Sequence, residues 1–271
     1  MSRDRSQPEI PLAGGNMSGV VVRVGDTVRR PVHPQTETVH RLLEHVRAAG
    51  VTWVPRVRGY DEAGREVLDY VEGEVAHGEA PYVRDEAVLV AVARASREWH
   101  DATETFERRA DDVWFWPPGR SPAEVIAHND FAPYNHVFRD GKFVGAIDFD
   151  LCYPAPRLWD LAWTAYRYVP LTPPVGASVA DGADADRSPF NVSAMLSRAG
   201  AFVDAYGPVG RPGEAGPDRA YDVGELLAWV PERLHAIADW AGAQDSADHR
   251  RWAVMYRAHA KWVSAGGLAR V

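Results

Sequence analysis

Residues 127–150, AHNDFAPYNHVFRDGKFVGAIDFD, gather carboxylates, amides and imidazoles among apolar neighbours. Asn135 and Asp148 offer an amide oxygen and a carboxylate, which are the hard oxygen ligands that magnesium prefers. Asp130, five residues before Asn135, would lie beside such a metal and could accept a proton from a hydroxyl group. Phosphoryl transfer uses this combination, because the protein has to position the acceptor and neutralise charge on the phosphates.

A hairpin is expected to bring these side chains together. Apolar arms at residues 136–138 and 143–147 flank an Asp-Gly dipeptide at 140–141, which is typical of two-residue hairpin turns. A hairpin returns its two ends to one place, so Asn135 and Asp148 need not be separated in space. The pattern therefore predicts that all three side chains converge at the open end of this hairpin.

Two further regions must hold the hairpin in place. Short β-branched segments separated by turn residues predict a small sheet with one helix in the first 72 residues, and the apolar spacing after Gly73 is mostly helical. Residues 170–189, rich in Pro, Gly and Asp, are expected to form a loop. The expected strands are 9–12, 20–24, 27–30, 54–59 and 66–71, and the expected helices are 37–49, 87–100, 192–206, 223–243 and 249–264.

Composition limits the classes of function. The 271 residues carry a net charge of −8 and no run of Lys or Arg, unlike a nucleic-acid-binding protein. Cys152 is the only cysteine, which excludes an intrachain disulfide and indicates a reducing compartment. No segment approaches about 18 consecutive apolar residues, and the first residues do not resemble a signal peptide. We therefore expect a cytoplasmic protein that binds neither nucleic acid nor membranes; its oligomeric state stays open.

Three motifs occur in order along the second half of the chain. Residues 128–130, His-Asn-Asp, followed by Asn135, match the pattern H-x-D-x-x-x-x-N, and residues 148–150, Asp-Phe-Asp, are a variant of D-F-G. Residues 156–162, PRLWDLA, place an acid near the start of a helix. In this spacing the motifs resemble those of the aminoglycoside phosphotransferase and choline kinase-like family, whose members have a protein-kinase-like fold.

The resemblance implies an α+β protein with two lobes. A small N-terminal antiparallel sheet lobe with one helix, residues 1–72, would bind the nucleotide. A larger, mainly helical lobe, residues 73–271, would hold the catalytic and acceptor-binding groups. The implied reaction is transfer of the γ-phosphoryl group of ATP or GTP, with Mg²⁺, to a hydroxyl of a small molecule. An aminoglycoside or another antibiotic is one such acceptor, as in resistance or self-protection.

Site residues follow from the resemblance, position by position. Asp130 would be the catalytic base or hydroxyl-orienting group, and Asn135 and Asp148 would be the magnesium ligands. The glycine-containing segment 14–19 could cover the phosphates through backbone N–H groups, and residues 69–71 would form the hinge beside the nucleotide base. The remaining implied residues either support the catalytic groups or contact the nucleotide: His128, Asp150 and Asp160, and Ser18, Arg29, Asp69, Tyr70 and Val71.

The N-terminal half departs from the family pattern at its cation. No Lys occurs in the first 141 residues, so the family's β3 Lys has no counterpart. Arg29 is expected to contact the α- and β-phosphates instead, with Arg30 as its rival on the opposite face of the strand. Glu37 and Glu44 are the candidates for the acidic partner. Two further departures replace glycines of the family motifs: Asn129 in the catalytic loop and Asp150 in the D-F-G position.

Two other classes of function fit parts of the sequence. H-x-D with a distant His is also the ligand pattern of non-haem iron oxygenases, here His128 and Asp130 with His235 or His259. The helical pattern after residue 150 disfavours this class, because such a site normally lies in a barrel of strands. A catalytically inactive nucleotide-binding module would explain the missing Lys. The presence of a proton acceptor beside both metal ligands argues against it.

Overall fold

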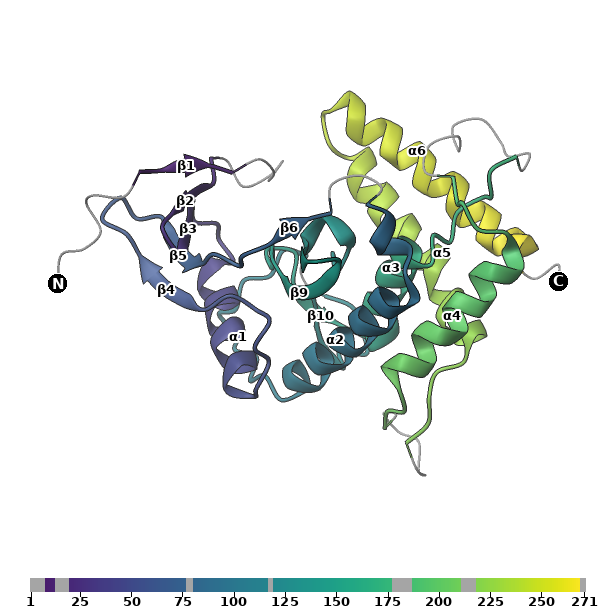
Figure 1. The fold of residues 1–271 in the computed structure, drawn as a ribbon, viewed down its shortest axis with the longest axis horizontal. Helices are drawn as coiled ribbons and strands as arrows, with labels where there is room; N and C mark the ends of the chain where they lie inside the picture. Colours follow the sequence, from purple (N-terminus) through teal and green to yellow (C-terminus); the bar gives the residue numbers. More distant parts are fainter. Residues whose placement is uncertain are drawn as a thin grey trace.

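The computed structural model describes residues 8–12, 20–76, 80–116, 119–176, 187–210 and 218–268. An antiparallel sheet with one helix lies at one end of an elongated molecule, and helices of the C-terminal half lie at the other (Figure 1). Smaller strands and one long helix, α2 (Glu86–Glu104), lie between them. The arrangement is the predicted α+β one, with a small sheet region and a larger, mainly helical region.

Within the described residues, the N-terminal sheet has five antiparallel strands in the order β1-β2-β3-β5-β4. Their bounds are β1 Ile10–Pro11, β2 Val22–Val24, β3 Thr27–Arg30, β4 Val57–Tyr60 and β5 Glu66–Asp69. All five lie within the stretches that the sequence predicted, apart from Tyr60 at the end of β4. In the β3–β5 pair Arg30 is directly opposite Glu66. The last residue of β3 therefore faces the first residue of β5.

Helix α1 (Thr36–Ala48) connects this sheet to the rest of the molecule. It buries the apolar face that the spacing predicted, Val39, Leu42, Leu43 and Val46. These side chains belong to the same core cluster as residues of α2. The sheet region and the helical region thus share one continuous core.

Two small sheets lie near the centre of the molecule. Asp140 and Gly141 form the turn between residues 139 and 142, where one strand ends and the next begins. Their φ values are 51° and 69°, and a type I′ turn requires positive values at both positions. The predicted hairpin is therefore confirmed. The strands β6 Glu74–Val75, β8 His136–Arg139 and β9 Lys142–Ala146 form one sheet, and β7 Val125–Ala127 and β10 Tyr153–Ala155 form the other. Neither β6 nor the β7–β10 pair was predicted.

The remaining elements are helical. The longer helices are α3 Arg157–Tyr168, α4 Val192–Tyr206, α5 Val223–Gly242 and α6 Ala247–Trp262, and the short ones are η1 Pro81–Arg84, η2 Pro133–Asn135 and η3 Val263–Gly267. Asp222 and Glu225 form a capping box that fixes the start of α5. Helix α5 packs against both α3 and α6, so it connects the C-terminal helices to the centre. The predicted helices for α4, α5 and α6 agree within about two residues at each end.

The structure bears in part on two predicted boundaries, the one between the lobes and those of the loop at 170–189. The first strand after residue 73, β6, pairs with β8 rather than with the N-terminal sheet, while the lobe boundary itself stays a prediction. The ends of the expected loop at 170–189 meet in a bridge between Pro174 and Ser188, and residues 177–186 lie outside the described residues. Within the described ranges, no helix has the length and apolar character needed to cross a membrane.

Candidate active site

The β8–β9 hairpin brings Asn135 and Asp148 to one end of the site. Asn135 ends η2 immediately before β8, and Asp148 follows β9 by two residues. His136 pairs with Ala146, and the N–H of Ile147 donates to the carbonyl of Asn135 at 2.8 Å. Two residues that are 13 positions apart in the sequence therefore lie on neighbouring stretches of backbone.

The carboxylate of Asp130 lies against Asn135 and is held by three donors. Asn135 Nδ2 donates to Asp130 Oδ2 at 2.8 Å and to the Asp130 carbonyl at 3.0 Å. The Tyr134 hydroxyl and Trp163 Nε1 both donate to Asp130 Oδ1, at 2.5 and 2.9 Å. Because Nδ2 of Asn135 is directed at Asp130, its Oδ1 is the atom left for a cation.

Asp148 lies in a backbone conformation that side chains rarely adopt. Its φ is 64°, in the left-handed region, and its side chain is 36% exposed. Surrounding protein atoms and the negative charge of Asp150 raise the pKa of Asp148 to about 6, while Arg30 acts in the opposite direction. A carboxyl group that is costly to ionise among other acids gains strongly from a bound divalent cation.

The cation beside these acids is Arg30. Its guanidinium makes a two-pronged contact with Asp150, at 2.9 and 2.8 Å, and lies 3.7 Å from Asp148 Oδ1. Arg30 Nε is also 2.7 Å from Glu66 Oε1, and Glu66 Oε2 is 2.9 Å from His40 Nε2 on α1. A planar guanidinium suits this paired recognition better than an ammonium group does. Arg30 thus connects β3 with β5, α1 and the Asp-Phe-Asp segment.

The expected choice between the two arginines needs correction. Arg29 points the other way, with its NH1 3.8 Å from Asp61, because neighbouring strand residues face opposite sides of the sheet. Arg30, and not Arg29, lies beside the predicted metal-binding carboxylate. Neither proposed acid is its partner, since Glu37 accepts a hydrogen bond from the Tyr60 hydroxyl and Glu44 is exposed. The partner acid comes from β5.

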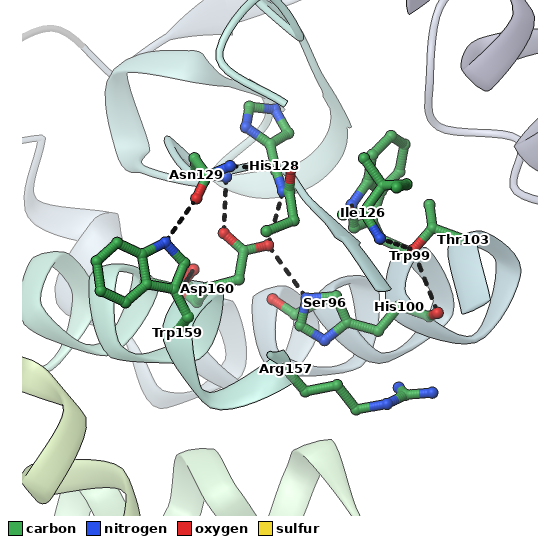
Figure 2. Close-up of polar contacts among 12 residues, drawn as sticks. Ser96, Trp99, His100, Thr103, Ile126, His128, Asn129, Arg157, Trp159 and Asp160 are labelled. Carbon is green, nitrogen blue, oxygen red and sulfur yellow. Dashed lines mark hydrogen bonds and ion pairs between the residues drawn. The ribbon is translucent and has the colours of Figure 1, made fainter. Parts of the chain in front are cut away.

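Asp160 on α3 holds the catalytic loop by accepting hydrogen bonds from its backbone (Figure 2). It is 3% exposed, and its oxygens accept the backbone N–H groups of His128 at 2.8 Å and Asn129 at 2.7 Å. His100 Nε2 lies 3.1 Å from the same carboxylate, and its Nδ1 faces the Tyr206 hydroxyl at 2.9 Å. Although burial acts to raise it, these hydrogen bonds lower the pKa of Asp160. The loop is therefore anchored on one ionised, buried carboxylate.

Asn129 occupies a position where the family motif has Gly. Its backbone conformation and its side-chain hydrogen bonds both make this replacement possible. Its φ is 66°, and Asn enters the left-handed region more readily than most residues. Its Nδ2 donates to the carbonyls of Ala127 and Leu151, and its Oδ1 accepts the Trp159 indole N–H at 2.9 Å (Figure 2). Both departures from glycine, at 129 and at 150, thus have partners that compensate for them.

His128 is fully buried between aromatic rings, including those of Trp99 and Phe149. Its Nδ1 accepts the backbone N–H of Asp130 at 3.3 Å. Burial lowers the pKa of His128, so it is neutral at pH 7. The position suits the supporting role that the resemblance implied.

The predicted nucleotide contacts are only partly placed. The N–H of Tyr70 donates to the carbonyl of Asp26 at 2.8 Å, so this group is already used within the sheet. The Tyr70 ring lies under Arg23, and Asp69 pairs with Arg58 at 2.5 Å. The side chain of Val71 packs against the hairpin at Gly145, where a Cβ atom on residue 145 would come within 2.8 Å of the Val71 side chain. Segment 14–19, including Ser18, lies outside the described residues.

Residues 80–196 match the phosphotransferase enzyme family. This range contains the catalytic loop, the hairpin, the Asp-Phe-Asp segment and α3. A trifolitoxin immunity protein from Rhizobium leguminosarum bv. trifolii is 38% identical to this chain over 159 residues. That match spans 57% of this chain and 59% of the relative's own length.

The fold is that of kinase-like phosphotransferases. A choline/ethanolamine kinase family protein from Mesorhizobium loti superposes with a TM-score of 0.61 at 17% identity, covering 95% of this chain and 88% of that one. A choline kinase from Cryptosporidium parvum gives 0.61 at 12% identity, with 97% and 91% covered. An ADP-bound aminoglycoside phosphotransferase gives 0.51 at 11%, with 94% of each chain covered. The predicted protein-kinase-like, two-lobed fold and the resemblance to this family are confirmed.

Magnesium fits the donors of this phosphotransferase-like site. In the described part of the chain, no group of three or more His, Cys, Asp or Glu is arranged to hold a metal. The candidate set is instead one amide oxygen and one carboxylate, and magnesium typically binds few protein ligands and completes its shell with water and phosphates. The carboxylates of Asp148, Asp150 and Glu66 lie around Arg30, and the negative charge of Asp130 also acts on Asp148. This excess of negative charge favours a divalent cation.

The iron-oxygenase ligand set does not assemble. His128 is enclosed by aromatic rings, His235 is exposed on α5, and His259 is buried on α6 with its Nδ1 at 2.8 Å from the Tyr166 hydroxyl. The phosphotransferase motifs, by contrast, meet at one place. The kinase-like fold therefore excludes the barrel that the alternative required.

Several residues of the site could not be selected from the sequence. Glu66 and His40 reach Arg30 through strand pairing and the packing of α1, which the sequence does not specify. Tyr134 and Trp163 contact Asp130 from η2 and α3. Of these two, Tyr134 would have been easier to predict from the sequence, because it lies between the motif residues Asp130 and Asn135.

Proposed function

We propose that the protein is a cytoplasmic, Mg²⁺-dependent O-phosphotransferase that moves the γ-phosphoryl group of ATP or GTP to a hydroxyl of a small molecule. The observation that carries this proposal is the convergence of Asp130, Asn135 and Asp148 at the open end of the β8–β9 hairpin. The match to the phosphotransferase enzyme family covers the same residues. The fold supports it independently, because the site lies where the sheet region meets the helical region.

Each residue has a distinct task in this proposal. Asp130 orients the acceptor hydroxyl and takes its proton, while the Asn135 amide oxygen and Asp148 hold magnesium. When bound, magnesium would neutralise charge on the nucleotide phosphates. Arg30 contacts the phosphates in place of the usual Lys, and Asp150 holds Arg30 toward the site. Asp160 and His128 keep the loop in position.

The nucleotide would lie between the two regions. Residues 69–71 would border its base, and Ser18 with segment 14–19 would approach its phosphates. Arg29 has no place in this part of the proposal, because it faces Asp61. The donor is ATP or GTP.

The acceptor is proposed to be an antimicrobial compound that bears a hydroxyl group. The immunity protein that matches this chain favours a role in self-protection or resistance. Aminoglycosides are one candidate class, supported by the fold of the phosphotransferases that resemble this chain. The net charge of −8 suits a small-molecule acceptor better than nucleic acid.

The test is nucleotide consumption in the presence of Mg²⁺, ATP or GTP, and a panel of hydroxyl-bearing antibiotics and metabolic alcohols. We expect transfer by the wild-type protein and at least a roughly hundredfold loss in Asp130→Ala and Asp148→Ala, the scale of a lost general base or metal ligand. Asp245→Asn, on an exposed side chain, is the matched control. Substantial transfer by either site variant would overturn the proposal.

A second candidate is a catalytically inactive nucleotide-binding module. The specific observation in its favour is that Arg30 is already bound by both Asp150 and Glu66. The same assay distinguishes the two functions. Tight ATP binding with no turnover for any acceptor would favour the inactive module.

A further inference from the structure

The two oxygens of the Asp130 carboxylate have unequal surroundings. Oδ1 accepts two hydrogen bonds, one from the Tyr134 hydroxyl at 2.5 Å and one from Trp163 Nε1 at 2.9 Å. Oδ2 accepts one, from Asn135 Nδ2 at 2.8 Å. A carboxylate offers about four lone-pair positions. Among the described residues, both positions on Oδ1 are therefore taken, and one position on Oδ2 is open.

The donors to Oδ1 are fixed by their own surroundings. Tyr134 lies in η2, and the guanidinium of Arg167 is 5.3 Å from the centre of its ring. Trp163 is 2% exposed on α3, with the guanidinium of Arg233 4.8 Å from its ring. Arg233 NH2 also donates to the carbonyl of Asn129 at 2.7 Å. The two donors thus approach Oδ1 from different elements.

Both donors shield the same oxygen of Asp130. Trp163 is 2% exposed, and Tyr134 is half-buried as a whole residue. The hydrogen bonds that they donate to Oδ1 are both partly buried.

From this asymmetry we propose that Tyr134 and Trp163 are positioning residues that close Asp130 Oδ1, so that Oδ2 alone receives the acceptor's proton. The inference deepens the proposed phosphotransferase function and rests on it.

The chemical step balances with these atoms. The acceptor oxygen forms a bond to the γ-phosphorus, and the bond from that phosphorus to the β,γ-bridging oxygen breaks. The electron pair of the broken bond stays on the departing nucleoside diphosphate. The acceptor's proton passes to Asp130 Oδ2 and then to solvent.

The experiment compares Tyr134→Phe and Trp163→Phe with the wild-type protein. The first readout is the KM for ATP, measured with Mg²⁺ by nucleotide consumption. We expect it to be unchanged in both variants, because the two side chains contact Asp130 and not the groups proposed to bind the phosphates. Tyr166→Phe, which removes a hydroxyl that contacts His259 instead, is the control.

The second readout is transfer to an acceptor identified in the panel. Both variants should lose about tenfold in kcat with little change in the acceptor's KM. An unchanged kcat for transfer in folded Tyr134→Phe or in folded Trp163→Phe would overturn the proposal, and so would a loss of the same size in Tyr166→Phe. Thermal unfolding confirms that each variant is folded. A wild-type protein that consumes no nucleotide under any condition would refute the proposed function itself, which separates the two failures.

Discussion

The catalytic loop and the cation on β3 face each other across the candidate site, and different contacts hold them. The loop is anchored on one buried carboxylate, Asp160, mainly by backbone N–H groups close to it in the fold. Arg30 is held by charges from Asp150 and Glu66, which come from separate elements. The loop keeps the family's motif spacing, whereas the cation departs from it. The two departures from the family pattern, Arg30 in place of Lys and Asp150 in place of Gly, are tolerated together because their opposite charges pair.

The largest expected effect is on the cation. Arg30→Ala would leave Asp150 and Glu66 as buried carboxylates without their cation, and the loss of one partner from a buried ion pair costs about 3–5 kcal/mol. Urea unfolding would measure the free energy of unfolding, and calorimetry would measure ATP affinity. We expect both to fall.

Arg29→Ala and Arg58→Ala sharpen this comparison. Arg29 faces Asp61, away from the site, so its removal should leave ATP affinity within a factor of about two. Arg58 is 46% exposed, and removing its pair with Asp69 should cost less than about 1 kcal/mol. A loss of ATP affinity in Arg29→Ala that exceeds the loss in Arg30→Ala would show that the assignment of the cation is wrong.

The next effect is on the loop. Asp160→Asn keeps the shape but offers one oxygen where two backbone N–H groups and His100 now bind. One buried donor would be left without a partner, which costs about 1–3 kcal/mol. Urea unfolding and a transfer assay should both show a loss. Asp239→Asn, whose pair with Arg257 is exposed, is the control, and equal losses in the two variants would contradict the anchoring role.

A smaller effect comes from pH. Burial lowers the pKa of His100, His128 and His136, so they stay neutral in the folded protein while the unfolded chain takes up protons near pH 6.5. The free energy of unfolding should therefore fall as the pH falls, by at most about 2 kcal/mol from pH 7 to 6. Asp148, with its pKa raised to about 6, would offset a few tenths of this.

Urea titrations at pH 7 and pH 6 measure this pH dependence directly. Replacing the exposed His235 with Gln should leave the difference between the two values unchanged. A protein that is equally stable, or more stable, at pH 6 would show that the buried histidines are not held neutral.

Much of the loop and hairpin could be predicted because its information is local. The Asp-Gly dipeptide specifies the turn through two positive φ values, and the turn brings Asn135 to Asp148. The helices α4 to α6 could be predicted equally well, since their apolar spacing and caps lie within each segment.

The cation site could not be predicted because it depends on pairing between distant segments. Alternation along β3 shows that Arg29 and Arg30 face opposite sides, but it does not show which side faces the hairpin. That choice follows from the β3–β5 pairing, which sets Arg30 opposite Glu66, and from the packing of Asp150 against β3. The β7–β10 pair was missed for the same reason, since three-residue strands 28 positions apart give no periodic signal.

The central claim is that Asn135 and Asp148 hold one magnesium ion beside Asp130. Calorimetric titration of ATP with and without Mg²⁺, in the wild-type protein and in Asp148→Asn, tests it most directly. We predict that Mg²⁺ tightens ATP binding by at least about tenfold in the wild type, about 1.4 kcal/mol, and gives little gain in the variant. The same Mg²⁺-dependent gain in both proteins would contradict the claim.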